Sequence, residues 1–102
     1  MDDPRPRNER KALALCALAF DKLDRDDGTL RAMALAQIER WERQRLCSRY
    51  YIERWRELLA MDANDARRIA LAPTDEGQAL RANNPFPGFF SRDERAQLRR
   101  TA

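Results

Sequence analysis

Ile38-Glu39-Arg40-Trp41 is followed 14 residues later by the same tetrad, Ile52-Glu53-Arg54-Trp55, and this repeat decides the expected fold. Fourteen residues are two heptads, so on an α-helix the second tetrad returns to the face of the first with a drift of about 40°. No Gly or Pro interrupts residues 29–72. We therefore predict one long helix over about residues 29–61, with both indoles on a single stripe.

The stripe is interrupted by two polar residues, Arg45 and Ser48, which occupy heptad positions between the two tetrads. They indicate either a polar notch in one continuous helix or a break near Ser48, which would then be the N-cap of a second helix. Glu, Arg, Gln and Leu fill the surrounding positions, and all are good helix formers. We therefore favour the continuous helix and keep the break as the alternative.

The segments on either side of the central helix are expected to form shorter helices. An N-terminal helix over about residues 8–25 is indicated by apolar side chains at 3-4-3 spacing, and Asn8 is its expected N-cap. After residue 61, capping residues predict short C-terminal helices beginning near Asp62 or Asn64, near Thr74 and near Ser91, the last with Glu94 as a capping box. The expected fold is an all-α, small helical bundle, with residues 1–7 as a flexible arm and residues 8–102 as a single helical domain.

The turn after the first helix has a composition of its own. Asp24, Asp26, Asp27, Gly28 and Leu30 resemble the start of an EF-hand calcium loop. The chelating Glu near the end of such a loop is replaced by apolar residues at 32–34, and one residue is missing between the second and third acids. We therefore expect a turn here, in which Gly28 ends the first helix in a left-handed conformation and Thr29 caps the next helix.

The composition argues against several classes of function. The 102 residues contain no His and two Cys, so the usual general base near neutral pH and the imidazole metal ligand are both missing. No Gly-rich phosphate loop and no zinc-ligand spacing occurs, and no apolar run approaches the ~20 residues of a membrane span. We expect no enzyme activity, no metal, no other cofactor and no membrane partner. We also expect a cytoplasmic protein in which Cys16 and Cys47 are reduced thiols.

The first functional hypothesis is a protein–protein interaction or regulatory module that binds another protein, itself as a homodimer, or both. Trp, Tyr and Arg dominate binding interfaces, and both Trp and both Tyr of the chain lie in the 38–59 stretch. Three of the four Phe lie in a proline-bound loop, where they either plug the core or wait for a partner. The expected interface residues are Trp41, Tyr50, Tyr51, Trp55, Phe86, Phe89 and Phe90.

The second hypothesis is a nucleic-acid-binding regulator. The net charge is +3, and nearly all of the cations are Arg, with Lys only at positions 11 and 22. Along the long helix, Arg43, Arg45 and Arg49 are the least balanced by acids, and such a patch would contact phosphates. The intervening Glu residues at 39, 42, 53 and 57 would repel a phosphate backbone, so we rank protein interaction first.

Overall fold

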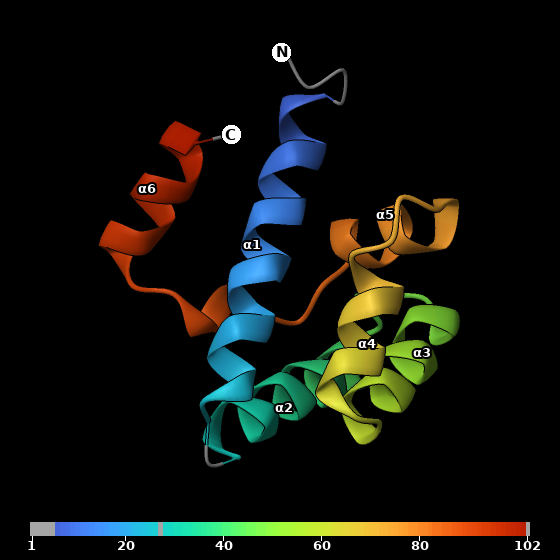
Figure 1. Cartoon of the computed structure of the whole chain (residues 1–102). Helices are drawn as coiled ribbons and strands as arrows, with labels where there is room; N and C mark the ends of the chain where they lie inside the picture. The colour runs from blue at the N-terminus through green and yellow to red at the C-terminus, as the bar shows by residue number, and fades with distance from the viewer. Residues whose placement is uncertain (1–5, 27, 102) are drawn as a thin grey trace.

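The computed structural model describes residues 6–26 and 28–101, and every regular element within them is a helix (Figure 1). The fold is all-α, as the sequence predicts. In chain order the elements are α1 (Arg7–Asp24), α2 (Thr29–Gln44), α3 (Arg49–Ala60), α4 (Ala63–Ala70), α5 (Asp75–Ala82), the 3₁₀ turn η1 (Pro87–Phe89) and α6 (Arg92–Thr101). Of the predicted flexible arm, residues 1–5 lie outside the described residues, and α1 already begins at Arg7, with Pro6 rather than Asn8 in the N-cap position.

The central helix is α1, which contacts α2, α4, α5 and α6. In Figure 1 it stands between α6 on one side and α4 and α5 on the other, with α2 at its lower end and α3 packed against α2 and α4. Its sequence explains this position, because Ala12 to Phe20 is apolar on nearly every face. Cys16, Ala19 and Phe20 are buried, while Leu15 and Leu18 pack around them from other faces of the helix.

The single helix predicted over residues 29–61 is wrong, because the chain folds back between α2 and α3. Arg45 adopts the left-handed conformation with φ 53°, and the amide N–H of Leu46 donates to the carbonyl oxygen of Trp41 at 2.9 Å, a Schellman-type helix end. A straight helix of 33 residues would be about 50 Å long, whereas the longest dimension of the molecule is 40 Å. Folding back brings both indoles to one core, a tertiary gain that outweighs local helix propensity.

Ser48 takes the N-cap position of α3, as the alternative prediction had it, although its side chain makes no capping hydrogen bond. The α2–α3 hairpin is held from both ends. At its base, the guanidinium of Arg31 donates to the carbonyl oxygen of Leu59. Nearer the turn, Arg56 forms a two-pronged ion pair with Glu42, with Nη2 to Oε1 at 3.1 Å and Nη1 to Oε2 at 3.3 Å.

The apolar stripe of the sequence survives the fold-back as the core of the hairpin. Ile38, Trp41, Ile52 and Trp55 are all buried, and Trp55 has no exposed surface. The indole N–H of Trp55 donates to the carbonyl oxygen of Asn83 at 2.7 Å, so the buried polar atom of this side chain is satisfied. The two tetrads therefore mark the buried face of two antiparallel helices rather than one stripe on a single helix.

The turn between α1 and α2 is a helix-capping turn. Gly28 is left-handed with φ 107°, as predicted, but it does not end the first helix: α1 ends at Asp24 with Arg25 as its C-cap, and Gly28 occupies the N-cap position of α2. The cap is not Thr29, however, but Asp26, whose Oδ2 accepts from the amide N–H groups of Gly28 at 2.9 Å and Leu30 at 2.7 Å. Asp24 forms an ion pair with Arg67 of α4 at 2.8 Å. Both carboxylates are thus engaged within the protein, while Asp27, the third acid of the calcium-loop resemblance, lies outside the described residues.

The short C-terminal helices begin where their capping residues predict. Asp62 accepts from the amide of Asn64, and Thr74 accepts from the amide of Gly77, each at 2.9 Å. Ser91 and Glu94 form the reciprocal capping box, with Ser91 N–H to Oε1 at 2.9 Å and Glu94 N–H to Oγ at 3.2 Å. Local side-chain chemistry therefore sets the start of α4, α5 and α6.

Gly77 lies inside α5 because no larger residue fits there. A Cβ at this position would lie 2.4 Å from the backbone oxygen of Ala72 and 3.0 Å from a guanidinium nitrogen of Arg81. We predict that Gly77→Ala lowers the free energy of unfolding by about 1–3 kcal/mol through overpacking, against the gain of about 1 kcal/mol expected for Ala at an open helical site. Urea denaturation measures the change, and a stabilised variant would contradict the close packing of α5 on residues 70–72.

Candidate functional site

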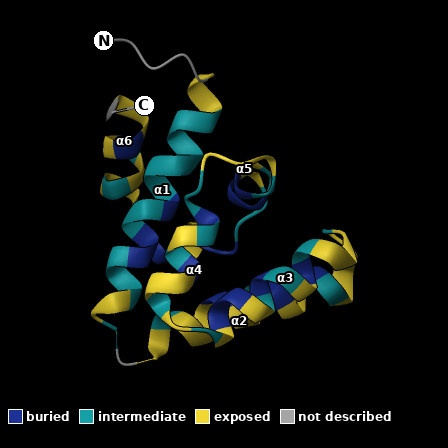
Figure 2. Cartoon of the chain, turned by 45° about the vertical axis from the view of Figure 1, so that its right-hand side comes forward, coloured by how far each residue is buried: buried dark blue, intermediate teal, exposed yellow. Residues whose placement is uncertain are grey.

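The free end of the α2–α3 hairpin gathers three Arg and two apolar side chains, and we call this surface the basic tip: Arg43, Arg45, Leu46, Arg49 and Tyr50. All five residues are exposed, with Leu46 at 59% and Tyr50 at 55% of their full accessible surface. Figure 2 shows the hairpin extending away from α1 and α6, with exposed residues at its free end. Large apolar side chains this exposed are candidates for burial by a partner.

The turn conformation produces the tip. In a continuous helix, Arg45 and Arg49 would share a face because they are four residues apart, but Arg43 would point away from both, because residues two and six apart do not share a face. The left-handed Arg45 ends α2, and residues 46–48 then lead directly into α3. The three predicted nucleic-acid residues and Tyr50, a predicted protein-interface residue, are thereby collected around one turn.

The charge of the tip is only partly balanced. Arg49 lies 3.7 Å from Glu42 and 3.4 Å from Glu53, but 70% of its side chain is exposed, so these pairs contribute little. Arg43 reaches Glu39 at 4.0 Å, and both side chains are more than 60% exposed. Among the described residues Arg45 has no ion-pair partner. The hydrogen bond from Arg56 and its charge hold the pKa of Glu42 below the usual value, so this carboxylate stays ionised beside Arg49.

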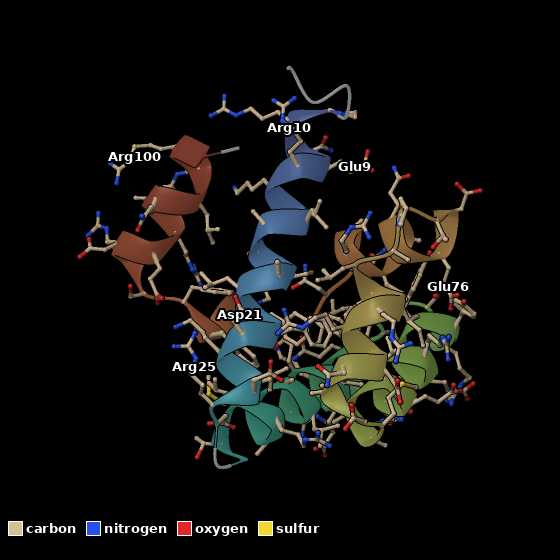
Figure 3. All side chains as sticks on the ribbon, in the orientation of Figure 1. Glu9, Arg10, Asp21, Arg25, Glu76 and Arg100 are labelled. Carbon is tan, nitrogen blue, oxygen red and sulfur yellow. The ribbon has the colours of Figure 1, made fainter. Side chains whose placement is uncertain are left out.

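Tyr50 also links the tip to α5. Its hydroxyl donates to Oε1 of Glu76 at 3.0 Å, and Nε of Arg54 donates to the same oxygen at 2.7 Å. Figure 3 labels Glu76 on the side of α5 nearest to α3. The hydrogen bonds from Arg54 and then Tyr50 lower the pKa of Glu76, and the hydrogen bond to Glu76 raises the pKa of Tyr50. The network orients the Tyr50 ring, whose centroid lies 5.3 Å from that of Tyr51 in an edge-to-face arrangement.

The other predicted interface residues lie in the core. Trp41, Trp55, Phe86, Phe89 and Phe90 are each at most 8% exposed. Phe86 is the hub of the aromatic cluster, with ring centroids 5.6 Å from Phe20, 5.1 Å from Trp55 and 5.1 Å from Phe89. The three Phe side chains of this loop therefore pack in the core, which was the first of the two alternatives for the loop. Tyr51 is half-buried and packs against the same core.

Leu46 is the tip residue that the sequence interpretation missed. In the predicted continuous helix it was one more helix former, and nothing in its neighbours distinguished it. Its exposure follows from the turn alone.

The two thiols are free and shielded. Burial raises the pKa of Cys16 to about 12, against the opposing effect of the nearby Arg81 charge. Burial also raises the pKa of Cys47, with a backbone hydrogen bond at Ser48 acting in the other direction. Neither thiol is therefore activated as a nucleophile at neutral pH. Within the described residues there is no group of three or more potential His, Cys, Asp or Glu metal ligands, and no helix has the length and apolar character to cross a membrane.

A first prediction about the basic tip concerns its left-handed residue, Arg45. Arg45→Gly is expected to raise the free energy of unfolding by about 0.5–1 kcal/mol, because Gly adopts positive φ without the steric cost that a Cβ brings. Arg43→Gly is the matched control: it removes the same charge two residues earlier, inside α2, and should cost about 1 kcal/mol. Denaturant unfolding compares the two. Equal destabilisation by both changes would mean that Arg45 lies within a regular helix.

A second prediction concerns the Tyr50–Glu76 hydrogen bond. Glu76→Gln removes the negative charge beside the Tyr50 hydroxyl, so the pKa of Tyr50 should fall towards its ordinary value, as followed by NMR of ¹³Cζ-labelled tyrosine. Because the folded-state pKa of Glu76 is lowered, its contribution to stability is present above its unfolded pKa and is lost as pH falls through the folded value. The stability difference between wild type and variant should therefore shrink at acid pH.

Glu57→Gln is the control for this second prediction, since Glu57 also pairs with Arg54, at 2.9 Å, but does not contact Tyr50. A Tyr50 pKa that responds equally to both changes would contradict the described hydrogen bond.

A scan against protein-family models and searches of curated proteins and of solved structures each found no match to this chain.

Proposed function

We propose that this chain is a small, non-enzymatic protein–protein interaction module with a regulatory role, and that its contact surface is the basic tip. The observation that carries the proposal is the placement of Leu46 and Tyr50, each more than half exposed, directly after the exposed cationic residues Arg45 and Arg49 at one turn. Aromatic and Arg side chains supply most of the binding energy in interfaces. The fitting partner presents an apolar patch surrounded by carboxylates.

The tip is also preorganised. The Arg56–Glu42 ion pair joins the two helices of the hairpin, and Arg54 and Tyr50 tie α3 to Glu76 of α5. A rigid surface loses less conformational entropy on binding than a flexible loop does. The hairpin thus holds the exposed side chains of the tip in a fixed arrangement before a partner binds.

The alternative is nucleic-acid binding through Arg43, Arg45 and Arg49. The cationic turn, in which Arg45 has no ion-pair partner among the described residues, favours it. The carboxylates of Glu42 and Glu53 lie within 4 Å of the Arg49 guanidinium, and they would be repelled by a phosphate backbone. Exposed Leu46 and Tyr50 would gain little from phosphate contacts. Protein binding accounts for both the charge and the apolar surface.

Site-specific photo-crosslinking in the native host cells tests the proposal. Tyr50 is replaced by p-benzoylphenylalanine, and the same replacement at exposed Arg92, on α6, is the control. We expect a discrete crosslinked product from position 50 that is absent from position 92. The product should be lost with Arg45→Glu and Arg49→Glu, while the circular dichroism spectrum is unchanged. Identical products from both positions, or a product that survives charge reversal, would contradict a specific contact at the tip.

Titration of labelled duplex DNA at 50 and 200 mM salt tests the alternative. Binding that falls steeply with salt and is lost on replacement of Arg43, Arg45 and Arg49 by Ala would favour nucleic acid over protein. We expect no such binding.

Self-association stays a prediction. Like charges on two copies of the tip would repel each other, so a homodimer would need another face. Light scattering distinguishes the 12.0 kDa monomer from a species of twice that mass.

A further inference from the structure

A groove beside the basic tip runs between α2 and η1, and we call it the α2–η1 groove. Its volume is about 340 Å³. The apolar part of its lining includes Met33, which is 42% exposed, and the ring of Phe89. The polar part consists of Gln37, Arg40 and Arg43, which lie on one side of α2 at helical spacing. Arg43 belongs both to this groove and to the basic tip.

The charge of the groove distinguishes it from its neighbours. Four other cavities formed by described residues each include at least one carboxylate, such as Glu76 near α4 and α5 or Glu94 between α1 and α6. The α2–η1 groove is lined by two guanidinium groups and no carboxylate. Within the described part of the chain, Arg40 has no ion pair, and Arg43 has only the 4.0 Å contact with exposed Glu39.

We propose that the α2–η1 groove receives a short acidic and hydrophobic segment of the partner protein. One large apolar side chain of that segment lies against Met33 and Phe89, and flanking Asp or Glu carboxylates pair with Arg40 and Arg43. The complementary charge decides the occupant, because Arg presents a planar fork of donors that matches a carboxylate. This inference rests on the proposed function, since it describes the same partner, and it extends the contact surface from the tip along α2.

The structure supplies a reporter for the test. A Cβ added at Gly88 would lie 3.7 Å from the terminal methyl carbon of Met33, which places that methyl group at the groove. Protein labelled with methyl-¹³C methionine gives one signal for Met33 and one for Met61, which lines a different cavity among α1, α3 and α4. Met61 is therefore an internal control in the same sample.

The probes are three capped hexapeptides: Asp-Glu-Phe-Leu-Asp-Glu, its charge-reversed form Lys-Lys-Phe-Leu-Lys-Lys, and the polar form Asp-Glu-Ser-Ser-Asp-Glu. We expect the first to shift the Met33 methyl signal saturably without moving Met61. The other two should bind at least tenfold more weakly, because the charge-reversed peptide lacks the carboxylates and the polar peptide lacks the apolar side chains. Equal shifts with the charge-reversed peptide, or no Met33 shift with the acidic one at millimolar concentration, would overturn the proposal.

Two variants and one control sharpen the result. Arg40→Gln should weaken binding of the acidic peptide about two- to fivefold, the effect of one exposed ion pair, and Arg92→Gln, on α6, should leave it unchanged. Gly88→Leu should abolish binding by filling the groove, because φ at this position is not in the left-handed region, and among the described residues other than its chain neighbours only the Met33 methyl lies within 4 Å of the new Cβ. Unchanged affinity in both Arg40→Gln and Gly88→Leu would place the peptide elsewhere.

The peptide titration and the crosslinking experiment can fail separately. Crosslinking at position 50 without peptide binding would contradict the proposed peptide site in the α2–η1 groove but leave the basic tip as the contact surface. Peptide binding in the groove without a tip-dependent crosslink would remove the proposed function and leave an isolated peptide site.

Discussion

Phe86→Ala is expected to lower the free energy of unfolding by about 3–5 kcal/mol, the cost of deleting a fully buried aromatic side chain. Phe86 has no exposed surface, and its ring contacts Phe20, Trp55 and Phe89 in one cluster. Its removal leaves a cavity where α1, α3 and the loop before η1 meet. Domains of this size are typically stable by about 5–15 kcal/mol, so the variant should lose a large part of its stability and unfold at clearly lower denaturant concentration.

Chemical denaturation followed by far-UV circular dichroism measures this effect. Leu35→Ala is the matched control, because Leu35 is 40% exposed and its truncation should cost well under 1 kcal/mol. Phe86→Leu should fall between the two. A cost below about 1 kcal/mol for Phe86→Ala would show that the Phe loop is not part of the core.

Arg81→Ala is expected to cost about 2–4 kcal/mol, from a cavity and from two backbone acceptors that lose their donor. Arg81 is 2% exposed, and its Nη1 donates to the carbonyl oxygens of Ala70 at 2.9 Å and Ala72 at 2.8 Å. The Ala70 carbonyl lies at the C-terminal end of α4, where the helix dipole favours a cation, and the Ala72 carbonyl follows in the connection to α5. The side chain therefore fixes the turn between α4 and α5.

Arg81→Met separates the two contributions, because it restores most of the volume but leaves the carbonyl oxygens without the guanidinium. We expect Arg81→Met to be intermediate between wild type and Arg81→Ala in urea denaturation. A variant with Met that is as stable as wild type would mean that the buried charge contributes no net stability, as happens when a buried ion is replaced by a well-packed apolar residue.

Much of the fold could be predicted from local chemistry. The capping box at Ser91 and Glu94 and the cap at Thr74 gave the starts of α5 and α6, because a side-chain oxygen that satisfies an orphan amide is a local interaction. The spacing also indicated that Ile38, Trp41, Ile52 and Trp55 form one apolar stripe, although it did not decide between core and interface. The capping residue at the start of α2 was misassigned, since Asp26 and Thr29 both have the required chemistry and only the loop geometry chooses between them.

The fold-back at Arg45 was not the favoured prediction, and the break near Ser48 stayed the alternative, for a physical reason. A non-glycine residue in the left-handed region costs local free energy, and the Glu, Arg, Gln and Leu around it favour a continuing helix. The compensating gain is the burial of both indoles, which is a long-range effect. The burial of Arg81 could not be predicted either, because in the sequence Arg81 is one of many Arg residues and has polar neighbours in its helix.

The candidate site shares this dependence on the turn. The sequence indicated Arg43, Arg45 and Arg49 as nucleic-acid candidates and Tyr50 as a protein-interface candidate. Only the hairpin places all four residues on one surface. Trp41, Trp55, Phe86, Phe89 and Phe90 have side chains that suit an interface or a core equally well. Their burial is decided by how α1, α3 and α5 pack, which residue type alone does not determine.

The fold-back of α3 onto α2 is the claim on which both the core and the basic tip depend, and a distance between the two helices tests it most directly. Spin labels are attached through Ala32→Cys and Ala60→Cys, two exposed positions, in a Cys16→Ala, Cys47→Ser background. Double electron–electron resonance should give a distance of about 10–25 Å, set by the 8–10 Å separation of packed helices and the length of the labels. A peak near 42 Å, the length of about 28 residues in one straight helix, would contradict the hairpin.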